Sequence, residues 1–167
     1  MIYSTQGIVL KKIASGETDA MVVVYTRDFG KLYCRAQGVK KENAKLKGHI
    51  ESLSLSAIQF VLGKLGERLT YAQLLQSWPQ IRGEFDRFAV AIFMAELVDR
   101  HCLTGQPDIS IWELLLTSLA ALNHESPLNV SSVIHEFEKD FLRALGYDGA
   151  RDIGILGNPC KPMFIGI

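Results

Sequence analysis

The side chains best suited to binding chemistry are cations gathered in a short stretch of the first half. Six lie between positions 31 and 47, opposed there only by Glu42: Lys31, Arg35, Lys40, Lys41, Lys45 and Lys47. Long cationic side chains on a flexible segment contact phosphates and release the counterions condensed on a nucleic acid. Tyr33 lies between two of these cations, where an aromatic ring can stack on a base. The pattern favours a polyanion-binding surface, and the alternative is a solvated loop that keeps the protein soluble.

The charges of the whole chain are divided unevenly between its two halves. Residues 1–80 carry eleven lysines and arginines against six acids, whereas residues 81–167 carry seven against twelve, so a formal net charge of zero conceals halves of opposite sign. Such an asymmetry indicates a half that binds a polyanion and a half with another task.

Catalytic chemistry finds little support in the residue pattern. His101 and Cys102 are adjacent, and neighbours on a helix diverge by about 100°, so they cannot form a nucleophile and base pair. We expect Cys102 to pack in the core. The four histidines lack zinc-ligand spacing, and the chain has no phosphate-loop motif. We therefore expect a protein that is not an enzyme, with no cofactor and no metal.

The cationic stretch belongs to a segment with the two-residue period of β-strands. Five runs predict strands, of which 31–37 alternates clearly and 20–26 is too apolar to face water on either side: 7–13, 20–26, 31–37, 53–62 and 68–76. Residues 38–49 lack the pattern and predict a loop. Five short antiparallel strands with one long basic insertion predict a small closed barrel of the oligonucleotide/oligosaccharide-binding (OB) type.

After Ser77-Trp78-Pro79 the apolar period changes to that of a helix. We expect helices over residues 85–103, after a cap at Pro107-Asp108, and from near Ser126-Pro127 to a stop at Gly146. The predicted fold class is thus β followed by α in a multidomain chain. Its predicted parts are an OB-fold domain over 1–79, an all-α helical domain over 80–148, and an irregular or shortened tail over 149–167.

Four arginines of the helical part are candidate partner contacts, because each lies beside large apolar side chains: Arg82, Arg87, Arg100 and Arg143. An apolar groove rimmed by guanidinium groups would suit an acidic peptide with an apolar end. The alternative is surface pairing with the nearby acids Glu84, Asp86, Asp99 and Asp140, and spacing alone favours this alternative.

Several features bear on the compartment. The first residues lack the basic and apolar regions of a signal peptide, and the longest apolar run, 88–95, is too short to cross a bilayer. The three cysteines are odd in number and far apart. These features predict a cytoplasmic protein without a membrane partner.

A series of short motifs resembles one family, the bacterial recombination mediators of the RecO type, over residues 1 to about 148. The motifs are Gly7-Ile8-Val9-Leu10-Lys11, the acidic turn Glu17-Thr18-Asp19, Thr26-Arg27-Asp28-Phe29-Gly30-Lys31, Ala36-Gln37-Gly38-Val39-Lys40-Lys41, Lys45-Leu46-Lys47-Gly48, Ser77-Trp78-Pro79 with Arg82, Glu96-Leu97-Val98-Asp99, and Leu142-Arg143-Ala144-Leu145-Gly146-Tyr147. Each motif is weak alone, and their order and spacing together are fairly specific.

The resemblance implies an OB barrel, a helical domain and an activity without turnover in recombinational gap repair. RecO-like proteins bind single- and double-stranded DNA, anneal complementary strands, associate with RecR, bind the acidic tail of single-strand DNA-binding protein and help to load RecA in the bacterial nucleoid. The DNA-contacting role then falls on the basic strands and loop: Lys11, Lys12, Arg27, Lys31, Tyr33, Arg35, Lys40, Lys41, Lys45 and Lys47.

The chain departs from the family pattern after Gly146-Tyr147. RecO-like proteins usually continue for about another third of their length, often with a four-cysteine zinc-ribbon segment, whereas Cys160 is the only cysteine of this stretch. We expect no zinc site here and a shortened helical part. Two other functions remain open: a protein-interaction adaptor without catalysis, and a general OB protein that binds RNA or single strands.

Overall fold

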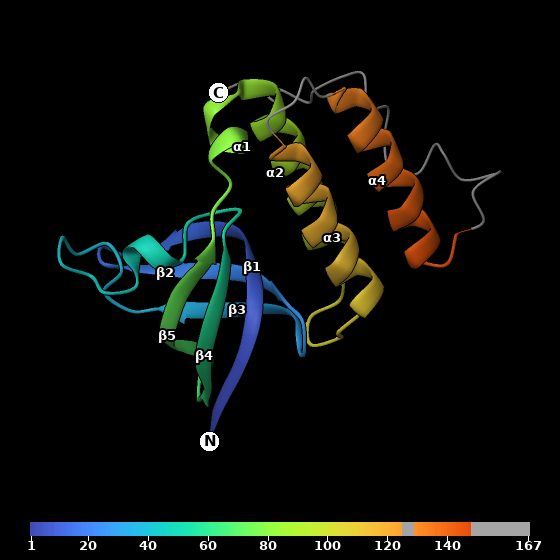
Figure 1. Ribbon diagram of the computed structural model, residues 1–167. Coiled ribbons are helices and arrows are strands. Elements are labelled where there is room, and N and C mark those ends of the chain that lie inside the picture. Colours follow the sequence, from blue (N-terminus) through green and yellow to red (C-terminus); the bar gives the residue numbers. More distant parts are fainter. Residues whose placement is uncertain (125–128, 148–167) are drawn as a thin grey trace.

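The computed structural model describes residues 1–124 and 129–147, which form a small barrel followed by helices (Figure 1). The strands are β1 (Ile2–Ser15), β2 (Asp19–Thr26), β3 (Gly30–Ala36), β4 (Leu55–Gly63) and β5 (Gly66–Gln76), with a short 3₁₀ turn η1 (Lys47–His49) between β3 and β4. The helices are α1 (Pro79–Gly83), α2 (Phe85–His101), α3 (Ile109–Leu122) and α4 (Val130–Ala144).

The strands close into a barrel in the order β1-β2-β3-β5-β4. All neighbouring pairs are antiparallel except β3 and β5, which pair in parallel where Cys34 meets Glu67 and Arg35 meets Arg68. A two-residue turn after Gly63 joins β4 to β5, and Gly66 adopts a φ of +100° there. This topology is that of an OB fold, so the predicted barrel is confirmed.

The alternation of side chains along β1 lets one strand contribute to two hydrophobic cores. The pairing with β2 shifts between Val9 and Lys11, as in a β-bulge. Val9 points into the barrel core with Val22 and Val24, whereas Ile8 and Leu10 pack outside the barrel against the helices. One side of β1 therefore packs in the barrel core, and its other side packs against the helical half.

The helices form as the sequence pattern predicts, with local signals at their ends. The Asp108 carboxylate accepts the backbone N–H of Ser110 and of Ile111 and caps α3. Beyond α4, Gly146 has a φ of +89°, and its N–H donates to the carbonyl of Arg143. Helix α1 and the turn η1 were not predicted from the sequence. The expected helix start at Ser126-Pro127 lies outside the described residues, as does the tail over 149–167 with Cys160.

The barrel and the helices share one hydrophobic cluster, so they are joined by packing as well as by the chain. Tyr25 of β2, Trp78 before α1 and Trp112 of α3 all belong to this cluster. The two parts also approach each other closely: the backbone of Gly30 lies so near that of Gln106 that a Cβ at position 30 would be 2.2 Å from the Gln106 carbonyl oxygen. A backbone bridge joins Lys31 to Thr104 beside it. The outer side of β1 and β2 is therefore covered by the helical half.

Candidate nucleic-acid interface

The basic loop between β3 and β4 lies at the end of the barrel where β1 turns into β2 (Figure 1). Asp19 at this turn holds the start of the loop: its carboxylate accepts the N–H of Gly38 at 2.8 Å and the Arg35 guanidinium at 2.8 Å. The Gly38 N–H, followed by Arg35, lowers the pKa of Asp19 to about 2. Lys40 adds a backbone bond to the carbonyl of Thr18.

The far end of the loop is held by His49. Its Nδ1 accepts the backbone N–H of Leu74 of β5 at 3.2 Å, and its carbonyl accepts the hydroxyl of Ser56 at 2.5 Å. The loop is thus attached at both ends to the barrel, and the span between the attachments is the part with the exposed lysines.

Four lysines of the loop are exposed to solvent: Lys40, Lys41, Lys45 and Lys47. The ammonium of Lys40 donates to the carbonyl of Gly16. Within the described part of the chain, Lys41, Lys45 and Lys47 make no side-chain hydrogen bond or ion pair. Their charges are therefore available to an anionic ligand.

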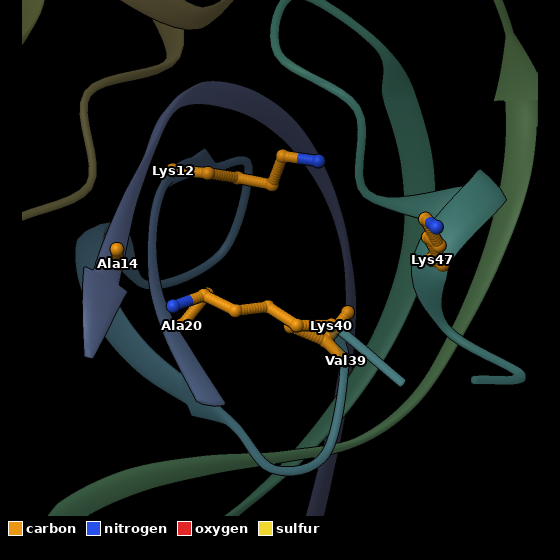
Figure 2. A pocket seen from close by; sticks show the side chains of 6 residues that line it. All are labelled: Lys12, Ala14, Ala20, Val39, Lys40 and Lys47. Carbon is orange, nitrogen blue, oxygen red and sulfur yellow. The ribbon is translucent and has the colours of Figure 1, made fainter. Parts of the chain in front are cut away.

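A pocket of about 170 Å³ opens at this end of the barrel, and Figure 2 shows its lining. Ala14 of β1, Ala20 of β2 and Val39 of the loop supply the apolar part, and the lysines at positions 12, 40 and 47 surround it. The Lys12 ammonium forms an ion pair with Glu51 at 2.7 Å. We call this feature, formed by Lys12, Ala14, Ala20, Val39, Lys40 and Lys47, the mouth pocket.

Two of the expected DNA contacts lie instead against helix α2. Lys31 is 6% exposed, and its ammonium donates to the backbone carbonyl of Asp99 and lies 3.5 Å from its carboxylate. The Lys11 ammonium is 2.5 Å from the other carboxylate oxygen. Burial by itself would raise the pKa of Asp99, but the hydrogen bond and charge of Lys11, with Lys31, hold that pKa below its usual value. Lys31 thus joins barrel and helices, which corrects its expected place on the DNA surface.

The remaining barrel candidates are spread over different sides. Tyr33 is 37% exposed, and its hydroxyl reaches the Asp99 carboxylate at 3.4 Å, so the ring borders the interface with α2. Arg27 is exposed in the turn that follows β2. Because β2 and β3 are antiparallel, this turn lies at the opposite end of the hairpin from Lys40. The structure therefore brings Lys12, Arg35 and the loop lysines together and leaves Arg27 apart from them.

The four arginines of the helical half do not meet at one groove. Arg87 is 4% exposed and donates to Glu84 and to the carbonyls of Leu122 and His124, so it is a structural residue. Arg100 pairs with Glu96, Arg143 pairs with Asp140, and Arg82 donates to the carbonyl of Ser52. Thirteen positions of α2 separate Arg87 from Arg100, which is about 20 Å along a helix.

Both cysteines of the described residues, Cys34 and Cys102, are buried. Cys102 is buried in the core, as predicted, and burial is the main cause that raises the pKa of its thiol to about 11. Burial likewise raises the pKa of the Cys34 thiol to about 12. In residues 1–124 and 129–147, no three His, Cys, Asp or Glu side chains gather as metal ligands. None of the helices in these ranges is both long and apolar enough to span a bilayer.

Two acids that organise the basic residues were missed from the sequence. Asp19 was noted only as part of the turn Glu17-Thr18-Asp19, and Asp99 only in the motif Glu96-Leu97-Val98-Asp99 and as a possible surface partner of an arginine. A carboxylate directly after a tight turn and beside a cationic strand was the available signal for Asp19. Nothing local marks Asp99, since its partner Lys31 is 68 positions away in the chain.

Comparisons with known proteins agree with this architecture. Residues 1–78 match the family model for the N-terminal part of recombination protein O, and residues 82–148 match the model for its C-terminal part. The chain belongs to the RecO family.

Curated relatives of this chain are named DNA repair protein RecO. The relative from Roseiflexus sp. (strain RS-1) is 28% identical over 146 residues, which cover 87% of this chain and 50% of the relative. The relative from Syntrophus aciditrophicus (strain SB) is 29% identical, and the aligned residues cover 90% of this chain and 58% of the relative. The relative from Nostoc punctiforme is 30% identical, and the aligned residues cover 79% of this chain and 44% of the relative. The chain thus spans about half the length of the curated relatives it matches.

Proposed function

We propose that this chain binds DNA in recombinational repair and has no catalytic residue of its own. The observation that carries the proposal is the set of exposed loop lysines at the barrel end, of which Lys41, Lys45 and Lys47 have no partner among the described residues. Cations free of internal partners neutralise phosphates without first breaking an ion pair. The names of the RecO relatives support a role in DNA repair.

The mechanism follows from the geometry of the loop. It is fixed at Asp19 and at His49, so its lysines are presented from one end of the barrel. A compact cluster of cations screens the phosphates of two strands at once and lowers their mutual repulsion. Complementary single strands held there pair more readily, so the proposed activity is annealing, with binding of both single- and double-stranded DNA.

The proposed partners are those of the RecO family: RecR, the C-terminal tail of single-strand DNA-binding protein, and the pathway that loads RecA. The acidic balance of residues 81–167 supports a division in which the helical half faces proteins and the barrel faces DNA. No surface for these partners is assigned to Arg82, Arg87, Arg100 or Arg143, because each is engaged by a neighbour.

The test measures the affinity for single-stranded oligonucleotides by fluorescence anisotropy at increasing salt. Four phosphate contacts predict a log–log slope of roughly −3, from about −0.7 per contact. Removing the four exposed lysines together (Lys40→Ala, Lys41→Ala, Lys45→Ala, Lys47→Ala) should flatten the slope and weaken binding for every sequence alike. The same variant should anneal complementary strands more slowly.

The matched control removes exposed lysines elsewhere, with Lys64→Ala in the β4–β5 turn and Lys139→Ala on α4. This control should keep both the affinity and most of the salt slope. Wild-type binding that does not respond to salt would contradict the proposal, and an unchanged quadruple variant would place the DNA elsewhere. Competition with RNA of matched sequence distinguishes DNA binding from the general RNA-binding alternative.

A further inference from the structure

The mouth pocket exists because small side chains lie side by side at one level of the barrel. Ala14 pairs with Ala20 across β1 and β2, and Ala20 pairs with Ala36 across β2 and β3. Residues directly opposite in antiparallel strands point to the same face, so these methyl groups face the same side of the sheet. Ala20 and Ala36 are buried in the barrel core. A larger side chain at position 14 would fill the opening.

The walls of the mouth pocket are made by lysine stems. Figure 2 shows the Lys40 side chain extended across one side of the opening, Lys12 along another, and Lys47 on the short helical turn η1 across from them. The alkyl stems of lysines cover apolar surface while their ammonium groups stay in water. Lys12 is paired with Glu51 and contributes its stem, whereas Lys47 has no partner in the described part of the chain.

This combination restricts the chemistry of a ligand. A bare phosphate gains nothing from a floor of Ala14, Ala20 and Val39, and a neutral apolar molecule gains nothing from the ammonium groups at the rim. A nucleotide carries both features, since a flat base without charge is attached to a backbone with negative charges on either side. Mouths of β-barrels are also a common location of ligand pockets.

We propose that the mouth pocket receives one unpaired base of a single DNA strand, while the neighbouring phosphates lie against Lys40 and Lys47. The proposal rests on the proposed DNA binding and adds a selection between strand states. A base inside a duplex is stacked and paired and cannot enter a pocket without being extruded, which costs free energy. The loop lysines therefore bind both forms of DNA, and the mouth pocket favours the single strand.

The decisive variant fills the pocket without changing any charge. Ala14 is exposed near the end of β1, where an aromatic residue suits a strand, so Ala14→Phe is expected to fold. We expect it to weaken binding of a single-stranded oligonucleotide roughly fivefold to tenfold, in the range of one lost base contact. Affinity for the matched duplex should stay within about twofold, and the salt slope should not change because no phosphate contact is removed.

A second readout follows the base itself. In a single strand that carries 2-aminopurine, the fluorescence of that base rises when it leaves the stack, so wild-type protein should raise it and Ala14→Phe should not. The control is Ala57→Phe on β4, whose neighbours Ser56 and Ile58 are buried, so that Ala57 faces away from the barrel interior. Ala14→Leu repeats the test with a smaller side chain, and thermal unfolding checks that each variant is folded.

The outcomes separate this inference from the proposed function. Loss restricted to the single strand supports the mouth pocket. Equal loss for single strand and duplex, or no loss with a folded variant, overturns the base pocket while DNA binding stands. Wild-type protein that binds neither form of DNA overturns the proposed function and the base pocket together.

Discussion

The two ends of the β2–β3 hairpin carry cations in opposite surroundings. At the end near α2, Lys31 is 6% exposed and engaged by Asp99. At the other end, the four loop lysines, Lys40, Lys41, Lys45 and Lys47, are exposed, and three of them lack a partner among the described residues. The difference teaches that a lysine of this barrel holds the fold together where a helix covers its strand and is available to a ligand where nothing packs against it.

The comparison also explains why the outer face of the β2–β3 strands is not the main candidate for DNA. In many OB folds this face binds the oligonucleotide. Here Val23 and Tyr25 lie in the cluster shared with the helices, and Tyr33 borders Asp99. Because the helices cover this face, the candidate contacts for DNA are the lysines of the loop and of the mouth pocket.

The largest effect is expected from Asp99→Ala, which leaves Lys31 buried without a counter-charge. Removing one member of a buried pair costs about 3 to 5 kcal/mol of the free energy of unfolding. Urea denaturation of the two proteins measures the loss. The matched variant Asp140→Ala, which breaks the exposed pair with Arg143, should cost under about 1 kcal/mol. Similar losses in the two variants would remove the distinction between buried and exposed charges.

Arg87→Ala tests the same distinction inside the helical half. It removes the donor to the carbonyls of Leu122 and His124 and to Glu84, so a loss of about 2 kcal/mol in the free energy of unfolding is expected. Arg100→Ala, on the exposed end of α2, serves as the control and should change little. If Arg87→Ala is as stable as the wild type, its guanidinium is not a structural group.

A smaller effect, on the loop alone, is expected from Asp19→Ala. This variant frees the N–H of Gly38 and the guanidinium of Arg35, so the loop opens more often. Limited trypsin digestion should then cleave after Lys40 and Lys41 several times faster. Asp28→Ala, at the other end of β2, is the control because, within the described residues, its carboxylate accepts a hydrogen bond only from the Thr5 hydroxyl. Equal cleavage rates would show that Asp19 does not hold the loop.

The smallest effect is a pH dependence. The pKa of Asp99 is held below its usual value of 3.8, so its contribution to stability is complete above about pH 4 and is lost as the pH falls through the lowered value. The stability difference between wild type and Asp99→Asn should therefore shrink as the pH decreases below 4. Urea midpoints at pH 7, 4 and 3 measure it, and a constant difference would contradict a charge-based role.

Much of the fold was predictable because its signals are local. The dense apolar, β-branched run over 20–26 and the alternation in 31–37 predicted strands at β2 and β3, and Asp108 marked the start of α3. The helix α1 and the turn η1 escaped prediction because each is about one turn long and carries no period. The loop lysines were identified from composition. The mouth pocket could not be predicted in this way, because it depends on which strands pair with each other.

The sequence by itself determined that a basic strand-rich half precedes an acidic helical half, and that the cations concentrate between Lys31 and Lys47. These properties follow from composition and short-range periodicity. Only the tertiary structure decided that Lys31 meets Asp99 of α2 while Lys41, Lys45 and Lys47 face solvent. The physical reason is that the charge and period of a strand are local, whereas what covers its outer face is set by packing against segments far away in the chain.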